Sequence, residues 1–171
     1  QGGLLPLPAS FNSSSWPRAI GRGSRKKGRT PMIVGIVKES FPNEARVAMV
    51  PALVPQLAKA GMEVVIQSGA GDAAGFLDDE YSAKGAKVVS ERAEVFQTAD
   101  LIAQVRALGA NPDAGKADLE LMKDGQIVVG ACEPLTEHES NKALAEKGVT
   151  LFSMEMMPRI TRAQSMDILS S

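Results

Sequence analysis

The sequence has few cysteine and histidine residues, the types that form disulfides, bind metal ions or take part in catalysis in many small proteins. Among its 171 residues there is one cysteine, Cys132, and one histidine, His138. A single cysteine excludes an internal disulfide and suits a reducing compartment. Cys132 follows an apolar run and is predicted to be a small core residue, whereas His138 is predicted to be exposed on a helix. No metal site is predicted.

Long hydrophobic runs are also missing, and the start of the chain lacks acidic residues. No segment approaches the run of about 18 apolar residues that crosses a membrane, so no span is predicted. Residues 1–31 hold six of the nineteen Lys and Arg residues, no Asp or Glu, and many Ser, Gly and Pro. This composition predicts a disordered basic leader, either a mitochondrial transit segment or sequence upstream of a true start at Met32.

The rest of the chain is acidic. Thirteen basic residues face twenty acidic ones beyond Pro31, a net charge of about −7 for that part. An acidic body lacks the positive surface that binds phosphate backbones, so nucleic acid is not predicted as a partner.

Short apolar segments rich in Val and Ile alternate with helical patterns. The segments predict strands at residues 33–37, 63–66, 87–89, 101–105, 126–130 and 149–152. Strands separated by helices form parallel β-α-β units with right-handed crossovers. The predicted fold class is therefore α/β, a doubly wound, mainly parallel open sheet of the flavodoxin or Rossmann type.

Turn and cap signals predict where the helices begin and end. Pro51 suits a first helical turn and Gly61 ends that helix. Side-chain caps are expected from Asp78 for the turn through Lys84, from Ser90 for residues 91–98, and from Thr136 with Glu139 for the helix ending at Gly148. Residues 69–75 nearly match a dinucleotide-binding glycine pattern, but their spacing favours a tight structural turn.

The last fifteen residues concentrate polar groups in a loop that runs into a predicted helix. Thr161 is a candidate N-cap, and Gln164, Asp167 and Ser171 would then share one helix face. From spacing alone, an ordinary amphipathic helix with a solvated polar face explains this pattern.

Two segments also resemble a known protein family, and an ordinary amphipathic helix does not account for that resemblance. The run from Arg159 to Asp167 resembles the nicotinamide-contacting loop of proton-translocating nicotinamide nucleotide transhydrogenases, and Ser170 matches a further family position. Residues 34–39 and 43–51 resemble the opening of the wider group that joins alanine dehydrogenases and transhydrogenases. The resemblance covers residues 32–171.

The resemblance implies how the chain is organised and which residues act. Residues 32–157 would form the first of two subdomains of an NAD(H)-binding unit, followed by a nicotinamide-contacting loop and helix start at 158–171. Arg159, Gln164 and Asp167 would be catalytic. The residues implied to contact the cofactor are Arg159, Ile160, Thr161, Arg162, Gln164, Asp167 and Ser170.

The same resemblance implies partners and a location. NAD(H) would bind to this chain, and NADP(H) would bind to a partner component. Membrane-spanning components would also be partners, and the protein would form a homodimer. The expected place is the cytoplasmic face of a bacterial inner membrane, with the mitochondrial matrix as the alternative.

Two alternatives remain open: an alanine-dehydrogenase-like oxidoreductase domain and a non-catalytic docking or dimerisation fragment. In alanine dehydrogenases the positions of Arg46, Arg106 and Glu133 carry Arg, Lys and His, which hold the keto acid and move a proton. Of these three positions, only Arg46 matches the alanine dehydrogenase residue. Its side chain could equally serve to support the loop to which it belongs. Direct hydride transfer between nicotinamides needs no base, only correctly positioned rings, which fits the loss of that histidine.

Overall fold

The computed structural model describes residues 30–166. Six strands form one all-parallel sheet in the order β3-β2-β1-β4-β5-β6. Their bounds are β1 Met32–Ile36, β2 Met62–Gln67, β3 Lys87–Val89, β4 Leu101–Arg106, β5 Ile127–Ala131 and β6 Thr150–Ser153. Each lies within one or two residues of its predicted position, and the predicted doubly wound fold is confirmed.

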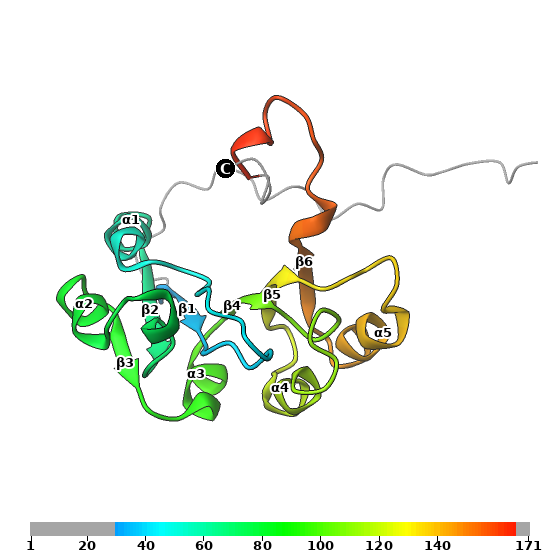
Figure 1. Ribbon diagram of the computed structural model, residues 1–171, viewed down its shortest axis with the longest axis horizontal. Coiled ribbons are helices and arrows are strands. Elements are labelled where there is room, and N and C mark those ends of the chain that lie inside the picture. Colours follow the sequence, from blue (N-terminus) through cyan, green and yellow to red (C-terminus); the bar gives the residue numbers. More distant parts are fainter. Residues whose placement is uncertain (1–29, 167–171) are drawn as a thin grey trace, which may run out of the picture. The chain divides into compact units, whose positions relative to one another are not determined.

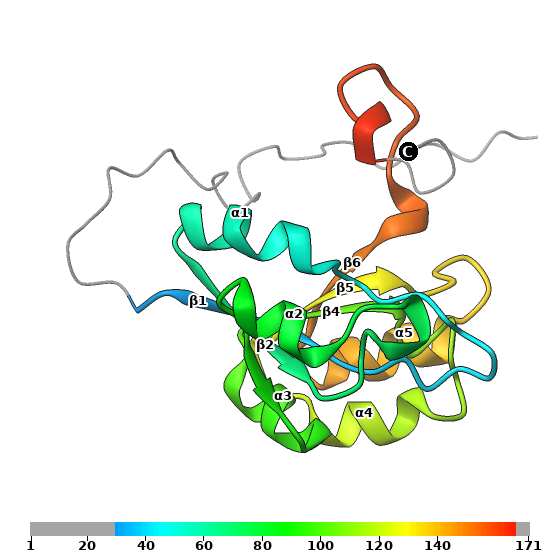
Figure 2. The same ribbon diagram turned by 60° about the vertical axis from the view of Figure 1, so that its left-hand side comes forward.

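Helices cover the two faces of the sheet unequally (Figures 1 and 2). One face carries α1 (Val54–Lys59) and α2 (Asp78–Ala83), and the other carries α3 (Arg92–Thr98), α4 (Gly115–Leu121) and α5 (His138–Glu146). Short 3-10 helices span Pro51–Leu53, Asp72–Ala74, Met154–Met156 and Gln164–Met166. Within residues 30–166, no helix has the length and apolar character needed to cross a bilayer.

Two hydrophobic clusters fill the space between these helices and the sheet. Val34 and Ile36 of β1 point to the α1–α2 side, where they meet Val54 and Tyr81. Ile102 and Val128 point to the opposite side, with Phe96, Leu144 and Cys132. Cys132 is fully buried, as predicted for a core residue. Gly35 lets α3 approach β1, because a Cβ there would lie 2.7 Å from the Cβ of Ala99.

The helix ends confirm some boundary predictions and correct others. Gly61 and Gly148 follow their helices with φ of +83° and +77°, which suits glycine. The three predicted side-chain caps are wrong. The residues at the caps are Leu77, Glu91 and Glu137, and none makes a side-chain cap hydrogen bond to its own helix.

Each misassigned cap residue has another position or partner. Asp78 is the first residue of α2, and its carboxylate accepts hydrogen bonds from Ser68 and Gly69 instead. The Thr136 hydroxyl turns back to the carbonyl oxygen of Glu133. Ser90 lies one residue before the actual cap, because α3 begins at Arg92.

Arg92 is the centre of a polar network that joins α3, α4 and the end of β1. Its Nε and Nη2 each lie 2.6 Å from a carboxylate oxygen of Asp118, and its Nη1 donates to the carbonyl of Lys38 at 2.6 Å. Gln104 of β4 donates to the same carboxylate at 2.8 Å. The Asp118 side chain is 4% exposed, so this bidentate pair is shielded from water.

The Asp118→Asn variant tests how much this network contributes to the unfolding free energy. It leaves the Arg92 guanidinium without its counter-charge in a mostly buried place, and we expect the unfolding free energy to fall by about 3 kcal/mol in urea denaturation. Glu94→Gln is the matched control, because it breaks the exposed pair with Lys87 and should cost less than about 1 kcal/mol. An equal loss of unfolding free energy in the two variants would contradict the stabilising role of the Arg92–Asp118 pair.

Candidate functional site

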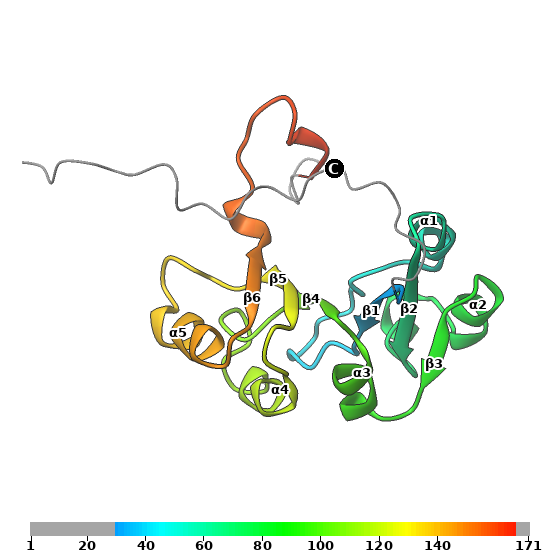
Figure 3. The ribbon, with the colours of Figure 1, turned by 180° about the vertical axis from the view of Figure 1, so that it is seen from behind.

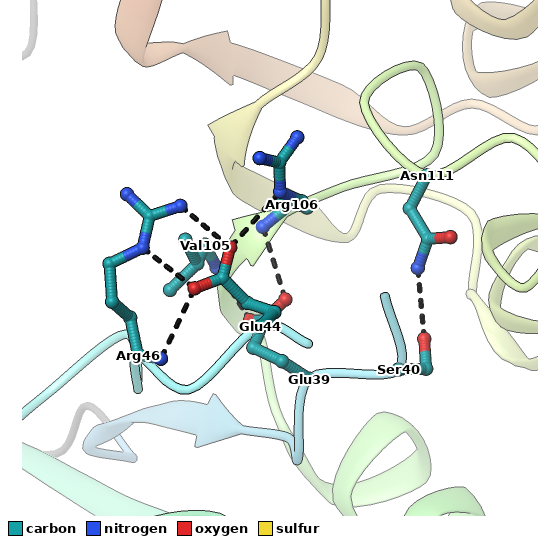
Figure 4. A network of polar contacts seen from close by, with 7 residues as sticks. All are labelled: Glu39, Ser40, Glu44, Arg46, Val105, Arg106 and Asn111. Carbon is teal, nitrogen blue, oxygen red and sulfur yellow. Dashed lines mark hydrogen bonds and ion pairs between the residues drawn. The ribbon is translucent and has the colours of Figure 1, made fainter. Parts of the chain in front are cut away.

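The carboxyl ends of the strands form the edge where open α/β sheets bind ligands. The strand order reverses between β1 and β4, and the crevice beside such a reversal is the usual binding position. Here the loop that follows β1 lies against the end of β4, and polar side chains join the two (Figure 4).

Glu39 ties the loop after β1 to the backbone of β4. One carboxylate oxygen accepts the N–H of Val105 at 2.6 Å, and the other accepts the N–H of Arg106 at 3.2 Å. Burial raises the pKa of Glu39 above its ordinary value, and the charge of Glu44 adds to this, while the two backbone hydrogen bonds oppose it. A second link joins the loops after β1 and β4, because the Asn111 amide donates to the Ser40 hydroxyl at 2.9 Å.

Glu44 lies between two arginines in the same cluster (Figure 4). Arg46 donates through Nε at 2.7 Å and Nη2 at 2.6 Å, and Arg106 donates through Nε at 3.0 Å. The hydrogen bonds from Arg46 are the main reason that the pKa of Glu44 falls to about 2. Arg106 also stacks over the Phe41 ring, with its guanidinium carbon 4.3 Å from the ring centre.

This arrangement bears on the alternative roles of Arg46. Its guanidinium binds a carboxylate only two residues away, as expected for an arginine that supports its own loop. The Glu44 side chain is 6% exposed and the Arg46 side chain 60%, so the pair sits at the surface with the acid turned inward. Sequence reasoning chose Arg46 and Arg106 but missed Glu44, although an acid two residues before Arg46 was a usable signal.

The glycine-rich turn after β2 is tight and is closed by internal contacts, the conformation that its spacing favours. Gly69 and Gly75 have φ of +71° and +85°. Asp78 accepts the N–H of Gly69 at 2.9 Å and the hydroxyl of Ser68 at 2.6 Å. An internal carboxylate thus takes the backbone donor that a phosphate would need.

The end of β5 forms a tight turn at Glu133, whose φ of +48° is unusual for a residue with a side chain. Glu155 accepts the N–H groups of Cys132 and Glu133 at 2.7 and 3.0 Å. Burial raises the pKa of the Cys132 thiol to about 12, so this cysteine is not a nucleophile near neutrality. His138 is exposed at the start of α5, as predicted.

The predicted nicotinamide-contacting residues lie on the segment that follows β6. Figures 1 and 3 show it leaving the sheet beyond the 3-10 helix Met154–Met156. Arg159, Ile160, Thr161, Arg162 and Gln164 are all exposed. The expected α-helix is, as far as Met166, a turn followed by a 3-10 helix from Gln164. Asp167, Ser170 and Ser171 lie outside the described residues, so the shared helix face stays a prediction.

Comparison with known proteins gives the chain its family. The family described as alanine dehydrogenase/PNT, N-terminal domain, matches residues 35–171. This chain belongs to that family. An NAD(P) transhydrogenase alpha subunit of Rickettsia prowazekii is 42% identical over 140 residues, covering 82% of this chain and 36% of that protein.

Two further relatives represent both branches of the family. The crystal structure of transhydrogenase from Sinorhizobium meliloti matches with a TM-score of 0.72 and 42% identity, covering 80% of this chain and 39% of that one. The alanine dehydrogenase of Methanococcus maripaludis is 36% identical over 132 residues, covering 77% of this chain and 34% of that protein. The chain therefore spans about a third of the length of each of these three relatives.

Charge removal at Glu44 should weaken the fold in a pH-dependent way. The folded pKa of about 2 lies below the ordinary 4.5, so the ionised carboxylate stabilises the fold above pH 4.5, and this contribution is lost as the pH falls toward 2. We expect Glu44→Gln to lower the unfolding free energy by about 1–2 kcal/mol at pH 7 in urea, and by less at pH 3.

Glu146→Gln is the control for Glu44→Gln. Glu146 pairs with Lys142 at 4.0 Å on the exposed face of α5, so its loss should stay within about 0.5 kcal/mol at either pH. A Glu44→Gln deficit that is the same at pH 7 and pH 3 would show that the carboxylate charge is not the source.

Proposed function

We propose that this chain is the N-terminal part of the NAD(H)-binding component of a proton-translocating NAD(P) transhydrogenase, which passes hydride directly between NADH and NADP⁺. The observation that carries the proposal is the segment from Arg159 to Ser170, whose Arg, Gln, Asp and Ser stand at the family's nicotinamide-contacting positions. The 42% identity to a transhydrogenase subunit supports the same branch of the family.

The chemistry of the segment fits the nicotinamide end of the cofactor. Arg159 and Arg162 supply donors, while Thr161 and Gln164 supply both donors and acceptors, and all four are exposed. Such groups can hold the carboxamide and ribose of a nicotinamide in a fixed orientation. The N–H groups of Gly69, Val105, Arg106, Cys132 and Glu133 already donate to internal carboxylates. These five donors are not available to a pyrophosphate, and the proposal gives that group to the second subdomain of the NAD(H)-binding component.

Positioning supplies the catalysis in this proposal. Bound NAD(H) supplies the hydride, and no protein group has to take up a proton in the transfer. Arg159, Gln164 and Asp167 would hold the nicotinamide, and direct transfer requires its reacting carbon within about 3–3.5 Å of the acceptor ring. Residues 32–157 form the supporting subdomain, and residues 158–171 carry the contacting loop.

The proposal extends to partners and location. An NADP(H)-binding component must present the acceptor ring, and membrane-spanning components must couple the transfer to proton movement. The assembly is proposed to be a homodimer of the NAD(H)-binding component at the cytoplasmic face of a bacterial inner membrane, with the mitochondrial matrix as the alternative.

Gln164→Asn tests the segment in the complete enzyme. The shorter side chain displaces the amide by one methylene, so we expect hydride transfer to slow on the order of a hundredfold while NADH affinity changes much less. Stopped-flow transfer from NADH to an NADP⁺ analogue measures the rate, and Asp167→Asn should behave in the same way. Gln56→Asn on the exposed face of α1 is the control. Wild-type rates in both segment variants would make the segment an ordinary solvated surface.

An alanine-dehydrogenase-like activity is the second candidate, because Arg46 is kept and the Methanococcus maripaludis relative is an alanine dehydrogenase. Glu133 stands where those enzymes carry a histidine, so we expect the complete enzyme not to convert pyruvate, ammonia and NADH into alanine. Absorbance of NADH at saturating pyruvate and ammonia measures this. Robust turnover would replace the transhydrogenase proposal with the dehydrogenase one.

A further inference from the structure

Glu155 connects two parts of the carboxyl edge that are far apart in the sequence. It belongs to the 3-10 helix Met154–Met156, directly after β6. Its Oε1 accepts the N–H of Cys132 at 2.7 Å and the N–H of Glu133 at 3.0 Å, both at the end of β5. Its Oε2 accepts the hydroxyl of Ser153 at 2.5 Å. One side chain therefore holds the ends of two neighbouring strands.

Glu155 favours the turn at Glu133, together with the N–H groups of Thr136 and Glu137 that donate to the Glu133 carbonyl. A non-glycine residue with φ of +48° costs about 1–2 kcal/mol, so it persists only where its surroundings favour it. Two successive N–H groups that converge on one anion provide such surroundings, and a carboxylate is a stronger acceptor than a carbonyl group. Glu155 supplies the anion from within the chain.

The same contacts fix the place where the proposed nicotinamide segment begins. Met157 is two residues beyond Glu155, and its N–H donates to the carbonyl of Met154 at 3.3 Å. Pro158 follows and restricts the backbone conformation of Met157. With the 3-10 helix held against β5, residues 157–166 leave the sheet in one direction.

We propose that Glu155 is a positioning residue, whose carboxylate holds the Cys132–Glu133 turn to the end of β6 and so sets the direction in which residues 157–166 leave the sheet. Its effect on hydride transfer rests on the proposed function; its effect on the segment's position does not. In this proposal Glu155 acts through Glu133 and the backbone beyond Met156, not through contact with cofactor or substrate.

Burial opposes ionisation of Glu155, but the hydrogen bonds from Ser153, Glu133 and Cys132 outweigh it and hold the pKa of Glu155 below its ordinary value. The ionised carboxylate therefore stabilises this contact above the ordinary carboxylate range, and the contact is lost as the pH falls through the lowered pKa. This titration is a signature that a purely apolar packing role would lack.

The first experiment is nuclear magnetic resonance on the 171-residue chain with ¹⁵N and side-chain ¹³C labels. The amide shifts of Cys132 and Glu133 should titrate with the same midpoint as the Glu155 carboxyl carbon. In Glu155→Gln this titration should vanish, and the amide shifts of Met157 and Ile160 should change. Glu139→Gln, an exposed acid in the first turn of α5, should leave all of these signals unchanged. Amides that do not follow Glu155, or a segment unmoved in Glu155→Gln, would overturn the proposal.

The second experiment links the position of the segment to the reaction in the complete enzyme. Glu155→Gln should slow hydride transfer at least tenfold with a melting temperature close to that of Glu139→Gln, and Glu155→Asp, which keeps the charge, should recover part of the rate. A wild-type rate in Glu155→Gln would refute the catalytic consequence. A wild-type enzyme without transhydrogenation would refute the proposed function instead, while the resonance experiment still decides the role of Glu155.

Discussion

Where the strands of a parallel sheet run into loops, some backbone N–H groups have no hydrogen-bond acceptor on a neighbouring strand. Each needs a partner, because an unpaired buried donor costs about 1–3 kcal/mol. This protein meets the need with its own carboxylates: Asp78 after β2, Glu39 at the end of β4 and Glu155 at the end of β5. Glu39 and Glu155 each reach from one connection to the end of another strand, whereas Asp78 closes the connection to which it belongs. The shape of the carboxyl edge depends on them.

That edge bears on how this common fold would serve the cofactor proposed for it. Where a nucleotide-binding sheet aims free N–H groups at phosphates, here the donors at three strand ends already have acceptors. In the proposed function, ligand contact falls to the exposed segment beyond β6, where donors and acceptors suited to a carboxamide and a ribose stand close together in the sequence. Orientation of a ring requires a few polar groups held firmly, and the sheet provides the support for them.

The parts of this structure that depend on local pattern could be predicted from the sequence. Val- and Ile-rich runs located all six strands, and Gly61 and Gly148 marked helix ends. The caps failed because Asp78 and Thr136 bind groups in the preceding loops instead of the helices that follow. The contacts at the carboxyl edge could not be predicted from the sequence for a related reason. Glu39 and Val105 are 66 positions apart, and Glu155 and Cys132 are 23 apart, so only the folded chain brings them together. Arg159 and Gln164 were chosen by resemblance, since their spacing alone fits any amphipathic helix, and their role stays a prediction.

The position of β6 in the sheet has a consequence for motion. It is an edge strand with a neighbour on one side only, and its Thr150 and Phe152 side chains are exposed, whereas β1 has neighbours on both sides and a buried core on each face. Amide protons in β6 should therefore exchange with solvent through small local openings, while those in β1 wait for global unfolding. The segment proposed to contact the nicotinamide is attached to one of the two edge strands of the sheet that residues 30–166 form. In the proposed function, local opening at β6 would let this segment adjust to a cofactor while β1 and the core stay folded.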